Sequence, residues 1–201
     1  MVVAPRVYIP IRGFAVAKQR LEHDLDATAR VDLATGLAAH TVAISRTAGV
    51  IPIIVSSSSS VRSWAAMHDL ARLDEPSQGG LNGAANTAVE HAGNDPWVIL
   101  HSDLPLLTPF ELRLLYDAND ADRPVVAPSY DGGTSAIAGY GSFRFSYGPG
   151  SFQRHISNRP RVVTSLGFLL DIDRPDDLIA ARHHPRGKWL DEILGAGPAA
   201  A

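Results

Sequence analysis

Residues 97–111, WVILHSDLPLLTPFE, hold the pattern that decides the fold of this chain. The segment 97–101 is short and almost wholly apolar, which predicts a buried strand. The run TPFE at residues 108–111 predicts the start of a helix, because it combines a capping box with a proline at the first helical position. Asp103 lies in the loop that joins the two elements. A strand, a loop and a capped helix form the repeating unit of an α/β fold.

The same alternation extends to both sides of this stretch. An amphipathic helix of about five turns is predicted over residues 29–48, and Gly49 is expected to end it. Residues 129–151 are rich in glycine and predict a long loop system with short strands. The alternation predicts an α/β fold with a mostly parallel mixed sheet sandwiched by helices. The other predicted strands are 7–11, 50–55, 125–127 and 168–172, and the other helices are 61–70, 81–91, a turn at 151–156 and a helix from 174.

The composition is that of a globular chain, with 201 residues, 45% apolar, 19% charged and a formal net charge of −3. We expect a single domain over residues 1–201, with a flexible tail from about residue 195. The absence of cysteine excludes disulfides, thiolate catalysis and cysteine-ligated metal sites. The weak net charge gives no sign of a nucleic-acid or membrane partner. Residues 1–13 lack the apolar run of a signal peptide, and no segment approaches the roughly 20 apolar residues of a spanning helix, so we expect a cytoplasmic protein.

Three aspartates are predicted to gather at the carboxyl edge of the sheet. Asp103 follows one predicted strand, and Asp171 and Asp173 flank Ile172 at the end of another. Alternation along a strand sends the last two to one face, where their charges repel unless a cation lies between them. Taken singly, Asp103 could cap a turn and Asp173 could cap the following helix. Together the three favour a site for Mg²⁺, which binds a few carboxylates together with substrate phosphates.

The loop after the first predicted strand is basic. Arg12, Gly13, Lys18 and Arg20 follow that strand closely, and such a loop suits a polyphosphate. It contains neither GxxxxGK[ST] nor GxGxxG. The alternative is a charged helix face in contact with solvent.

Two glycine-rich segments offer main-chain N–H groups and hydroxyls that could bind an anion. They are DGGTS at 131–135 and YGPGS at 147–151. Either alone is commonly a plain turn, but two of them near the predicted metal ligands favour an anion site. The segment GLN at 80–82 could approach a nucleotide through its main chain and amide, or could simply begin a helix.

In their order along the chain these segments resemble the CofC guanylyltransferases, which act in biosynthesis of the deazaflavin coenzyme F-420. The resemblance covers about residues 8–182. It implies a nucleotide-diphospho-sugar-transferase-like fold, Rossmann-like and GT-A-like, related to the molybdenum-cofactor guanylyl- and cytidylyltransferases. The segments that carry it are IPIRGFAVAKQRL, GLN, HSDLPLLTPFEL, DGGTSAI, FSYGPGSFQRH and GFLLDIDRPDDL.

The resemblance also implies an activity, the transfer of GMP from GTP to 2-phospho-L-lactate, phosphoenolpyruvate or 3-phospho-D-glycerate with release of pyrophosphate. A phosphate oxygen of the acid would be the nucleophile, and it needs no general base because the second pKa of a phosphate ester is about 6. By this resemblance Asp103, Asp171 and Asp173 would hold Mg²⁺; Thr134, Gly148 and Ser151 would hold the acid; Arg12, Gly13, Leu81 and Asn82 would bind the nucleotide; and Asp103, Lys18 and Arg20 would be catalytic.

The chain departs from the usual pattern of that family at three places. Arg12 stands where many relatives have lysine, the serines at 56–60 replace a stretch often rich in aspartate, and Ser135 replaces a common asparagine. A molybdopterin or sugar-phosphate acceptor is disfavoured, because the chain lacks a glycine-rich LAGGxSxRMG-like start. A non-catalytic GTP-binding protein and an unrelated α/β domain remain alternatives. A homodimer is compatible with the sequence, which leaves open the oligomeric state, the metal count and the acid.

Overall fold

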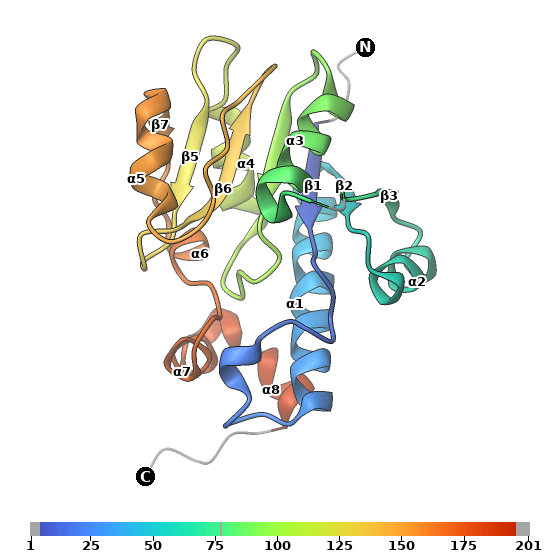
Figure 1. The fold of residues 1–201 in the computed structure, drawn as a ribbon. Helices are drawn as coiled ribbons and strands as arrows, with labels where there is room; N and C mark the ends of the chain where they lie inside the picture. The colour runs from blue at the N-terminus through green and yellow to red at the C-terminus, as the bar shows by residue number, and fades with distance from the viewer. Residues whose placement is uncertain (1–4, 77, 196–201) are drawn as a thin grey trace.

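Seven strands form one mixed sheet in the computed structural model, which describes residues 5–76 and 78–195 (Figure 1). Their order across the sheet is β3-β2-β1-β4-β6-β5-β7. The first four run parallel, and β6 is antiparallel to both of its neighbours. The predicted mostly parallel mixed sheet is thereby confirmed. The strands are β1 (Arg6–Pro10), β2 (Ile51–Val55), β3 (Ala71–Leu73), β4 (Trp97–Leu100), β5 (Val125–Pro128), β6 (Thr134–Gly139) and β7 (Arg161–Val162).

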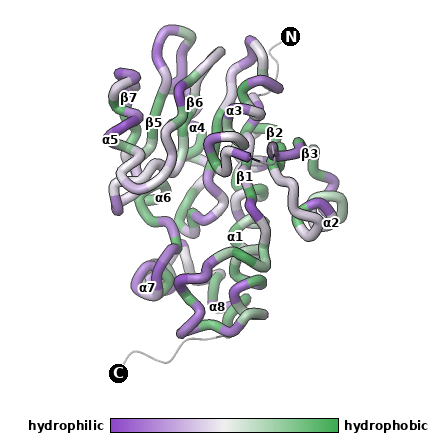
Figure 2. Tube along the Cα trace, in the orientation of Figure 1, coloured by the Kyte–Doolittle hydropathy of each residue, from purple (hydrophilic) through white to green (hydrophobic). Residues whose placement is uncertain are grey.

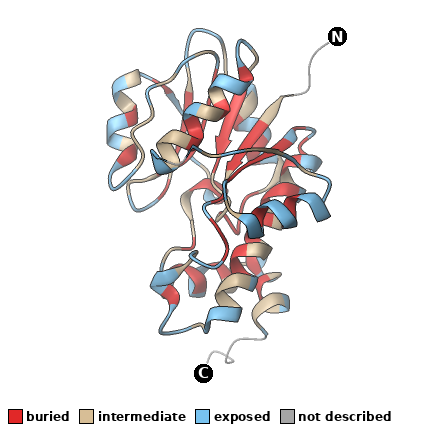
Figure 3. Cartoon of the chain, turned by 45° about the vertical axis from the view of Figure 1, so that its right-hand side comes forward, coloured by how far each residue is buried: buried red, intermediate tan, exposed pale blue. Residues whose placement is uncertain are grey.

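Helices pack on both faces of this sheet, because its central strands are apolar on both sides. Val7 and Ile9 of β1 face one core with α1, α2 and α4, whereas Tyr8 faces a second core with α3. Figure 2 shows hydrophobic residues along these strands, and Figure 3 shows that they are buried. The helices are α1 (Ala27–Thr47), α2 (Ser59–Met67), α3 (Gly80–Ala92), α4 (Pro109–Asp117), α5 (Ser151–His155), α6 (Leu166–Leu169), α7 (Pro175–His183) and α8 (Leu190–Leu194), with 3₁₀ turns at Gln19–Leu21, Ile156–Asn158 and Pro185–Gly187.

The predicted end of α1 at Gly49 and the predicted start of α4 at Thr108 are confirmed, whereas α1 begins two residues before its predicted start. Asp26 caps α1 by accepting from the N–H of Ala29 at 2.8 Å, and Gly49 follows the helix with a φ of +77°. Thr108 and Glu111 form the predicted capping box of α4. Capping satisfies main-chain groups that a helix leaves unpaired, so these ends position the loops that follow the strands.

A third, smaller apolar cluster lies beyond the carboxyl edge of the sheet, where α1, α7 and α8 pack together (Figure 1). Ile172 is fully buried in this cluster beside Leu33 and Leu37 of α1. The 3₁₀ turn contributes Leu21 to it. The cluster therefore anchors both the basic N-terminal loop and the segment with the two later aspartates.

The reversed strand β6 brings distant residues to one edge. Because β6 runs opposite to β4, it begins at the edge where β1 and β4 end. The N–H of His101 continues the β4–β6 ladder by donating to the carbonyl of Ser135 at 3.0 Å. The sequence predicted only short strands in this region, but β6 is a central strand of six buried residues.

The strand predicted at residues 168–172 is wrong. This segment passes from the short helix α6 into extended chain outside the sheet, and β7 pairs with β5 instead. The apolar residues of this segment are buried without forming a strand. Phe168 packs in the core on one face of the sheet, and Ile172 packs in the third cluster. The helix predicted at 61–70 begins and ends earlier, and the edge strand β3 was not predicted.

Two further predictions concern the limits of the chain. The predicted tail after residue 195 lies outside the described residues. Among residues 5–76 and 78–195, no helix combines the length and the apolar character needed to cross a bilayer.

Candidate active site

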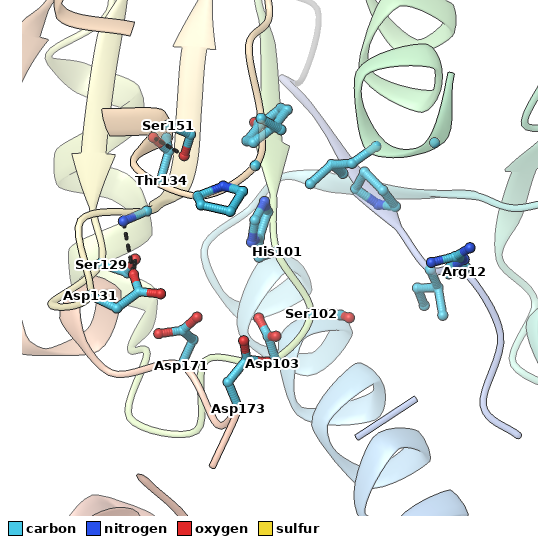
Figure 4. A pocket seen from close by; sticks show the side chains of 18 of the residues that line it. Arg12, His101, Ser102, Asp103, Ser129, Asp131, Thr134, Ser151, Asp171 and Asp173 are labelled. Atoms are coloured by element: carbon cyan, nitrogen blue, oxygen red, sulfur yellow. Dashed lines mark hydrogen bonds between the residues drawn. The ribbon is translucent and has the colours of Figure 1, made fainter. Parts of the chain in front are cut away.

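A cavity of about 830 Å³ opens at the carboxyl edge of the sheet (Figure 4). Its wall combines the ends of β1 and β4, the start of β6 and the loops before α3, α5 and α7. Ligands of open α/β sheets bind at this edge. The polar residues in the wall include Arg12, Arg20, Glu75, His101, Ser102, Asp103, Ser129, Asp131, Thr134, Ser151, Asp171, Asp173 and Arg174.

The three predicted aspartates meet in this cavity. Asp103, Asp171 and Asp173 each present a carboxylate oxygen within 4.8 Å of the others. The N–H of Ile172 donates to the carbonyl of Asp103 at 3.1 Å, which ties the two segments together. Burial of Ile172 between them leaves the other two side chains facing the cavity. The predicted juxtaposition is thus present although residues 168–172 are not a strand.

The Lys18 side chain lies against this carboxylate group. Its Nζ is 2.9 Å from Oδ2 of Asp103 and 3.7 Å from Oδ1 of Asp173, and it donates to the carbonyl of Ile172 at 2.5 Å. Burial by itself lowers the pKa of Lys18, but the three aspartate charges outweigh it and raise that pKa. Lys18 is therefore a fixed ammonium that neutralises part of the acidic group.

Arg20 lies farther out, where it is exposed and donates to Oδ2 of Asp173 at 3.1 Å. Arg12 also lines the cavity and is exposed, nearer to the loop before α3. Both guanidinium groups remain accessible to an anion in the cavity, whereas Lys18 is committed to the carboxylates.

Lys18 and Arg20 pair with Asp103 and Asp173, whereas Asp171 forms no ion pair within the described part of the chain. Burial and the negative charge of Asp103 raise the pKa of Asp171 to about 7. Burial also acts to raise the pKa of Asp103, but the Lys18 and His101 charges prevail and lower it. Oδ1 of Asp103 is buried and has no hydrogen-bond partner among residues 5–76 and 78–195. Three carboxylates with an unpaired oxygen and excess negative charge fit a divalent cation with oxygen ligands.

The predicted acid-binding residues lie on the opposite side of the cavity. The Ser151 hydroxyl donates to Oγ1 of Thr134 at 3.1 Å, and both residues are buried (Figure 4). Gly148 and Gly150 form the turn before α5 with φ values of +124° and +67°. Only glycine adopts the first of these readily, so the sequence YGPGS is needed for this turn.

The predicted nucleotide-binding residues are not all in the cavity. Leu81 lines it together with Gly80, but Asn82 accepts a hydrogen bond from the N–H of Tyr147 at 2.7 Å and lies outside the lining. Gly13 borders a second cavity of about 340 Å³ behind Lys18. Asn82 therefore holds the loop before α5 in place.

Two side chains that the sequence singled out as departures face away from the cavity. Ser135 is buried and donates to the carbonyl of Phe168 at 2.6 Å. Ser58 of the serine run lies beside Gly13, outside the main cavity. Ser135 therefore supports the α6 segment and has no contact with the space for the acid.

Three residues in the cavity wall or directly behind it were missed from the sequence. His101 is not among the site residues predicted from the sequence, yet it lines the cavity with a buried Nε2 that has no hydrogen-bond partner among the described residues. Glu75 follows β3, which was itself unpredicted, and His155 lies behind Thr134. Glu75 gave no usable signal because the strand before it was not recognised, and the placement of His155 depends on tertiary packing.

Comparison with known proteins agrees with this arrangement. The family model described as "Guanylyl transferase CofC like" matches residues 5–195. A phosphoenolpyruvate guanylyltransferase from Roseiflexus castenholzii is 31% identical over 193 residues, covering 88% of this chain and 87% of the relative. A 2-phospho-L-lactate guanylyltransferase from Methanopyrus kandleri is also 31% identical, covering 88% and 90%.

Solved structures show the same fold at lower identity. A protein from Desulfovibrio desulfuricans G20, classed as a nucleotide-diphospho-sugar transferase, superposes with a TM-score of 0.70 at 14% identity, covering 94% of each chain. A manganese complex from Mycobacterium tuberculosis H37Rv superposes with a TM-score of 0.55 at 20% identity, covering 89% of this chain and 97% of the other. With its family model matched over nearly its whole length, the chain belongs to the CofC-like guanylyl transferase family.

Proposed function

We propose that this protein is a guanylyltransferase. It transfers GMP from GTP to a small phosphorylated three-carbon acid and releases pyrophosphate, as a step of coenzyme F-420 biosynthesis. The observation that carries the proposal is the cavity itself, which joins an acidic cluster with Lys18 on one side to the Thr134 hydroxyl and the YGPGS turn on the other. The names of the two relatives support the acceptor class, because both transfer a guanylyl group to such an acid.

The size of the cavity supports two ligands in contact. Cavities for small molecules commonly measure about 300–1,000 Å³, and 830 Å³ is near the upper end of that range. The nucleotide would lie toward Arg12 and Leu81, and the acid would lie toward Thr134, Gly148 and Ser151. Asp103 lies between these two ends, at the start of the loop after β4.

The reaction needs positioning and charge stabilisation rather than a protein nucleophile. A phosphate oxygen of the acid forms a bond to the α-phosphorus of GTP, and the bond from that phosphorus to the β-phosphate oxygen breaks. The electron pair leaves with pyrophosphate. The second pKa of a phosphate ester is about 6, so the attacking oxygen is ionised at neutral pH. Holding the two anions in line is therefore the main contribution of the protein.

Asp103, Asp171 and Asp173 are the residues that would hold Mg²⁺, and a manganese ion in one protein of the same fold supports a divalent metal here. Such an ion would neutralise the charge that develops on the phosphates. Arg20 and Arg12 bind the departing pyrophosphate at the open side of the cavity. Lys18 holds Asp103 and Asp173 in position through its ion pairs.

We also propose that residues 1–201 make up one nucleotidyltransferase domain. One sheet contains all the strands from Arg6 to Val162. In the third apolar cluster, Ile172 and the C-terminal helices α7 and α8 pack against the N-terminal helix α1.

The test is an assay of purified protein with GTP, Mg²⁺ and each of three acids: 2-phospho-L-lactate, phosphoenolpyruvate and 3-phospho-D-glycerate. We expect pyrophosphate release and a guanylylated product with one acid. CTP and ATP serve as competing nucleotides, and a sugar phosphate serves as a competing acceptor. GTP binding without turnover on any acid would identify a non-catalytic nucleotide-binding protein and refute the proposal.

A further inference from the structure

A chain of three hydrogen-bonded side chains begins at the cavity wall opposite the aspartates, where Thr134 and Ser151 line the cavity, and ends at His155 behind them. The hydroxyl–imidazole chain consists of Ser151, Thr134 and His155, all of them buried. Oγ of Ser151 lies 3.1 Å from Oγ1 of Thr134, and Nδ1 of His155 lies 3.0 Å from the same oxygen. The predicted acid-binding residues include the two hydroxyls, whereas His155 has no role in that prediction.

The tautomer of His155 follows from its second nitrogen. The main-chain N–H of Ser146 donates to Nε2 at 2.9 Å, so Nε2 must be unprotonated. Burial, followed by the charges of Arg154 and His101, lowers the pKa of His155 to about 4, and the ring is therefore neutral at pH 7. A neutral imidazole carries one N–H, which must then be at Nδ1. His155 is consequently a donor to Thr134.

The direction of these bonds leaves one proton free. A threonine hydroxyl has two acceptor lone pairs and one proton. Oγ1 of Thr134 accepts from Ser151 and from Nδ1 of His155, which uses both lone pairs. Its own proton has no remaining role in the chain and can only be donated elsewhere. Thr134 lines the cavity, so the cavity is where that donation can occur.

The imidazole is held firmly in this orientation. The rings of Phe143 and Tyr147 pack on His155 with centroid distances of 5.7 and 5.1 Å. A ring flip would place carbon atoms against the Ser146 N–H and the Thr134 hydroxyl, which would cost two buried hydrogen bonds.

We propose that His155 is a positioning residue that makes Thr134 an obligate hydrogen-bond donor toward an anionic group of the phosphorylated acid. This inference rests on the proposed function. It assigns Ser151 a supporting role, because its hydroxyl proton is already given to Thr134. A donating Thr134 hydroxyl favours binding of a ligand with a carboxylate or phosphate oxygen at this position. It disfavours a ligand that presents only a hydrogen-bond donor there.

The hydrogen-bond chain can be tested without any substrate. In protein labelled with ¹⁵N-histidine, we expect the His155 signals at pH 7 to show a protonated Nδ1 and an unprotonated Nε2. Assignment by comparison with the His155→Asn variant identifies the signals. A protonated Nε2, or a doubly protonated ring, would overturn the inference whatever the enzyme does.

Kinetics test the consequence for the acid. His155→Leu removes the donor, and we expect the KM for the acid to rise about tenfold, as for one weakened hydrogen bond to a charged group, while the KM for GTP is unchanged. His155→Asn places an amide N–H near the position of Nδ1 and should restore most of the affinity. His183→Leu, the same substitution at an exposed histidine at the end of α7 that does not line the cavity, is the matched control and should leave the KM for the acid within about twofold.

A double-mutant cycle distinguishes positioning from a general structural role. Thr134→Val removes the free proton, so adding His155→Leu should not raise the KM for the acid further. Additive effects, or equal changes in the KM values for acid and GTP, would refute the inference. Absence of turnover by the wild-type protein on any acid would instead refute the proposed function, and the NMR measurement would still decide the tautomer.

Discussion

Lys18 Nζ lies 2.9 Å from Oδ2 of Asp103, across 85 residues of sequence. Lys18 makes this contact with a φ of +56°, a left-handed conformation that is unfavourable for a residue with a Cβ. The lysine thus takes up one oxygen of Asp103, while the other oxygen remains without a partner. A metal at this group would bind beside the ammonium, so both cations would share the charge of three carboxylates.

The carboxylates themselves can be tested by isosteric replacement. We expect Asp103→Asn and Asp173→Asn each to reduce pyrophosphate release about a thousandfold, because the metal supplies several kcal/mol of charge stabilisation. Circular dichroism should show an intact fold. Asp122→Asn, an exposed aspartate before β5 at the opposite edge, is the control and should retain full activity. Full activity in either site variant would refute the metal assignment.

Removal of Lys18 should reveal the charge imbalance. In Lys18→Met the Asp103 carboxylate loses its partner, and we expect a loss of about 3 kcal/mol in the free energy of unfolding without metal. Saturating Mg²⁺ or Mn²⁺ should recover part of this loss, since the metal binds the folded state. Arg20→Met, which removes an exposed partner of Asp173, should cost less than about 1 kcal/mol. Urea unfolding of wild type and of the two variants measures these free energies. Equal losses in Lys18→Met and Arg20→Met would contradict the prediction.

The pH dependence of stability should report Asp171. Its folded pKa of about 7 lies above the unfolded value of about 3.9, so the stability that the neutral carboxyl provides is fully present below about pH 4 and is lost as the pH rises from about 4 to 7. Without metal, wild type and Asp171→Asn should melt alike near pH 4, and the melting temperature of wild type should fall increasingly below that of the variant up to about pH 7.5, where the gap becomes constant. Excess Mg²⁺ should close this gap at neutral pH. A gap that is constant from about pH 4 to 7 would show that the pKa of Asp171 is not raised by folding.

The turn before α5 offers a test of main-chain geometry. Gly148→Ala must adopt a φ of +124°, and we expect it to cost about 1–2 kcal/mol and to raise the KM for the acid more than the KM for GTP. Gly49→Ala at the end of α1 introduces comparable strain away from the cavity. That control should lower the melting temperature and leave both KM values unchanged. Identical kinetic behaviour of the two variants would argue against a role of this turn in acid binding.

The parts of the fold that the sequence predicted are those with local signals. The capping box at Thr108 and the glycine after α1 depend on neighbouring residues only, and both are confirmed. Strand β6 has no such signal, because it consists largely of small residues. A Cβ at Gly139 would lie 2.7 Å from the Trp97 ring, so close packing requires glycine there. Small residues therefore mark a buried strand here, although they resemble a loop in the sequence.

In the candidate site, too, the features with a local sequence signal were predictable and those that depend on tertiary contacts were not. The grouping of Asp103 with Asp171 and Asp173 was predictable, since alternation around a buried isoleucine holds in extended chain outside a sheet as well as inside it. The orientation of Ser135 and Asn82 was not, because each side chain bonds a main-chain group brought near by the fold. His155 was missed for the same reason.

The pairing of Leu100 with Ala136 has a consequence for how this protein family can vary. It sets the spacing between the end of β4 and the start of β6, and so between Asp103 and Thr134. A slip of two residues would keep every side chain on its own face but would shift Thr134 by about 7 Å, far more than an in-line attack tolerates. A change of acceptor is therefore expected to arise in the flanking loops, because this ladder fixes the spacing between Asp103 and Thr134 that the reaction needs.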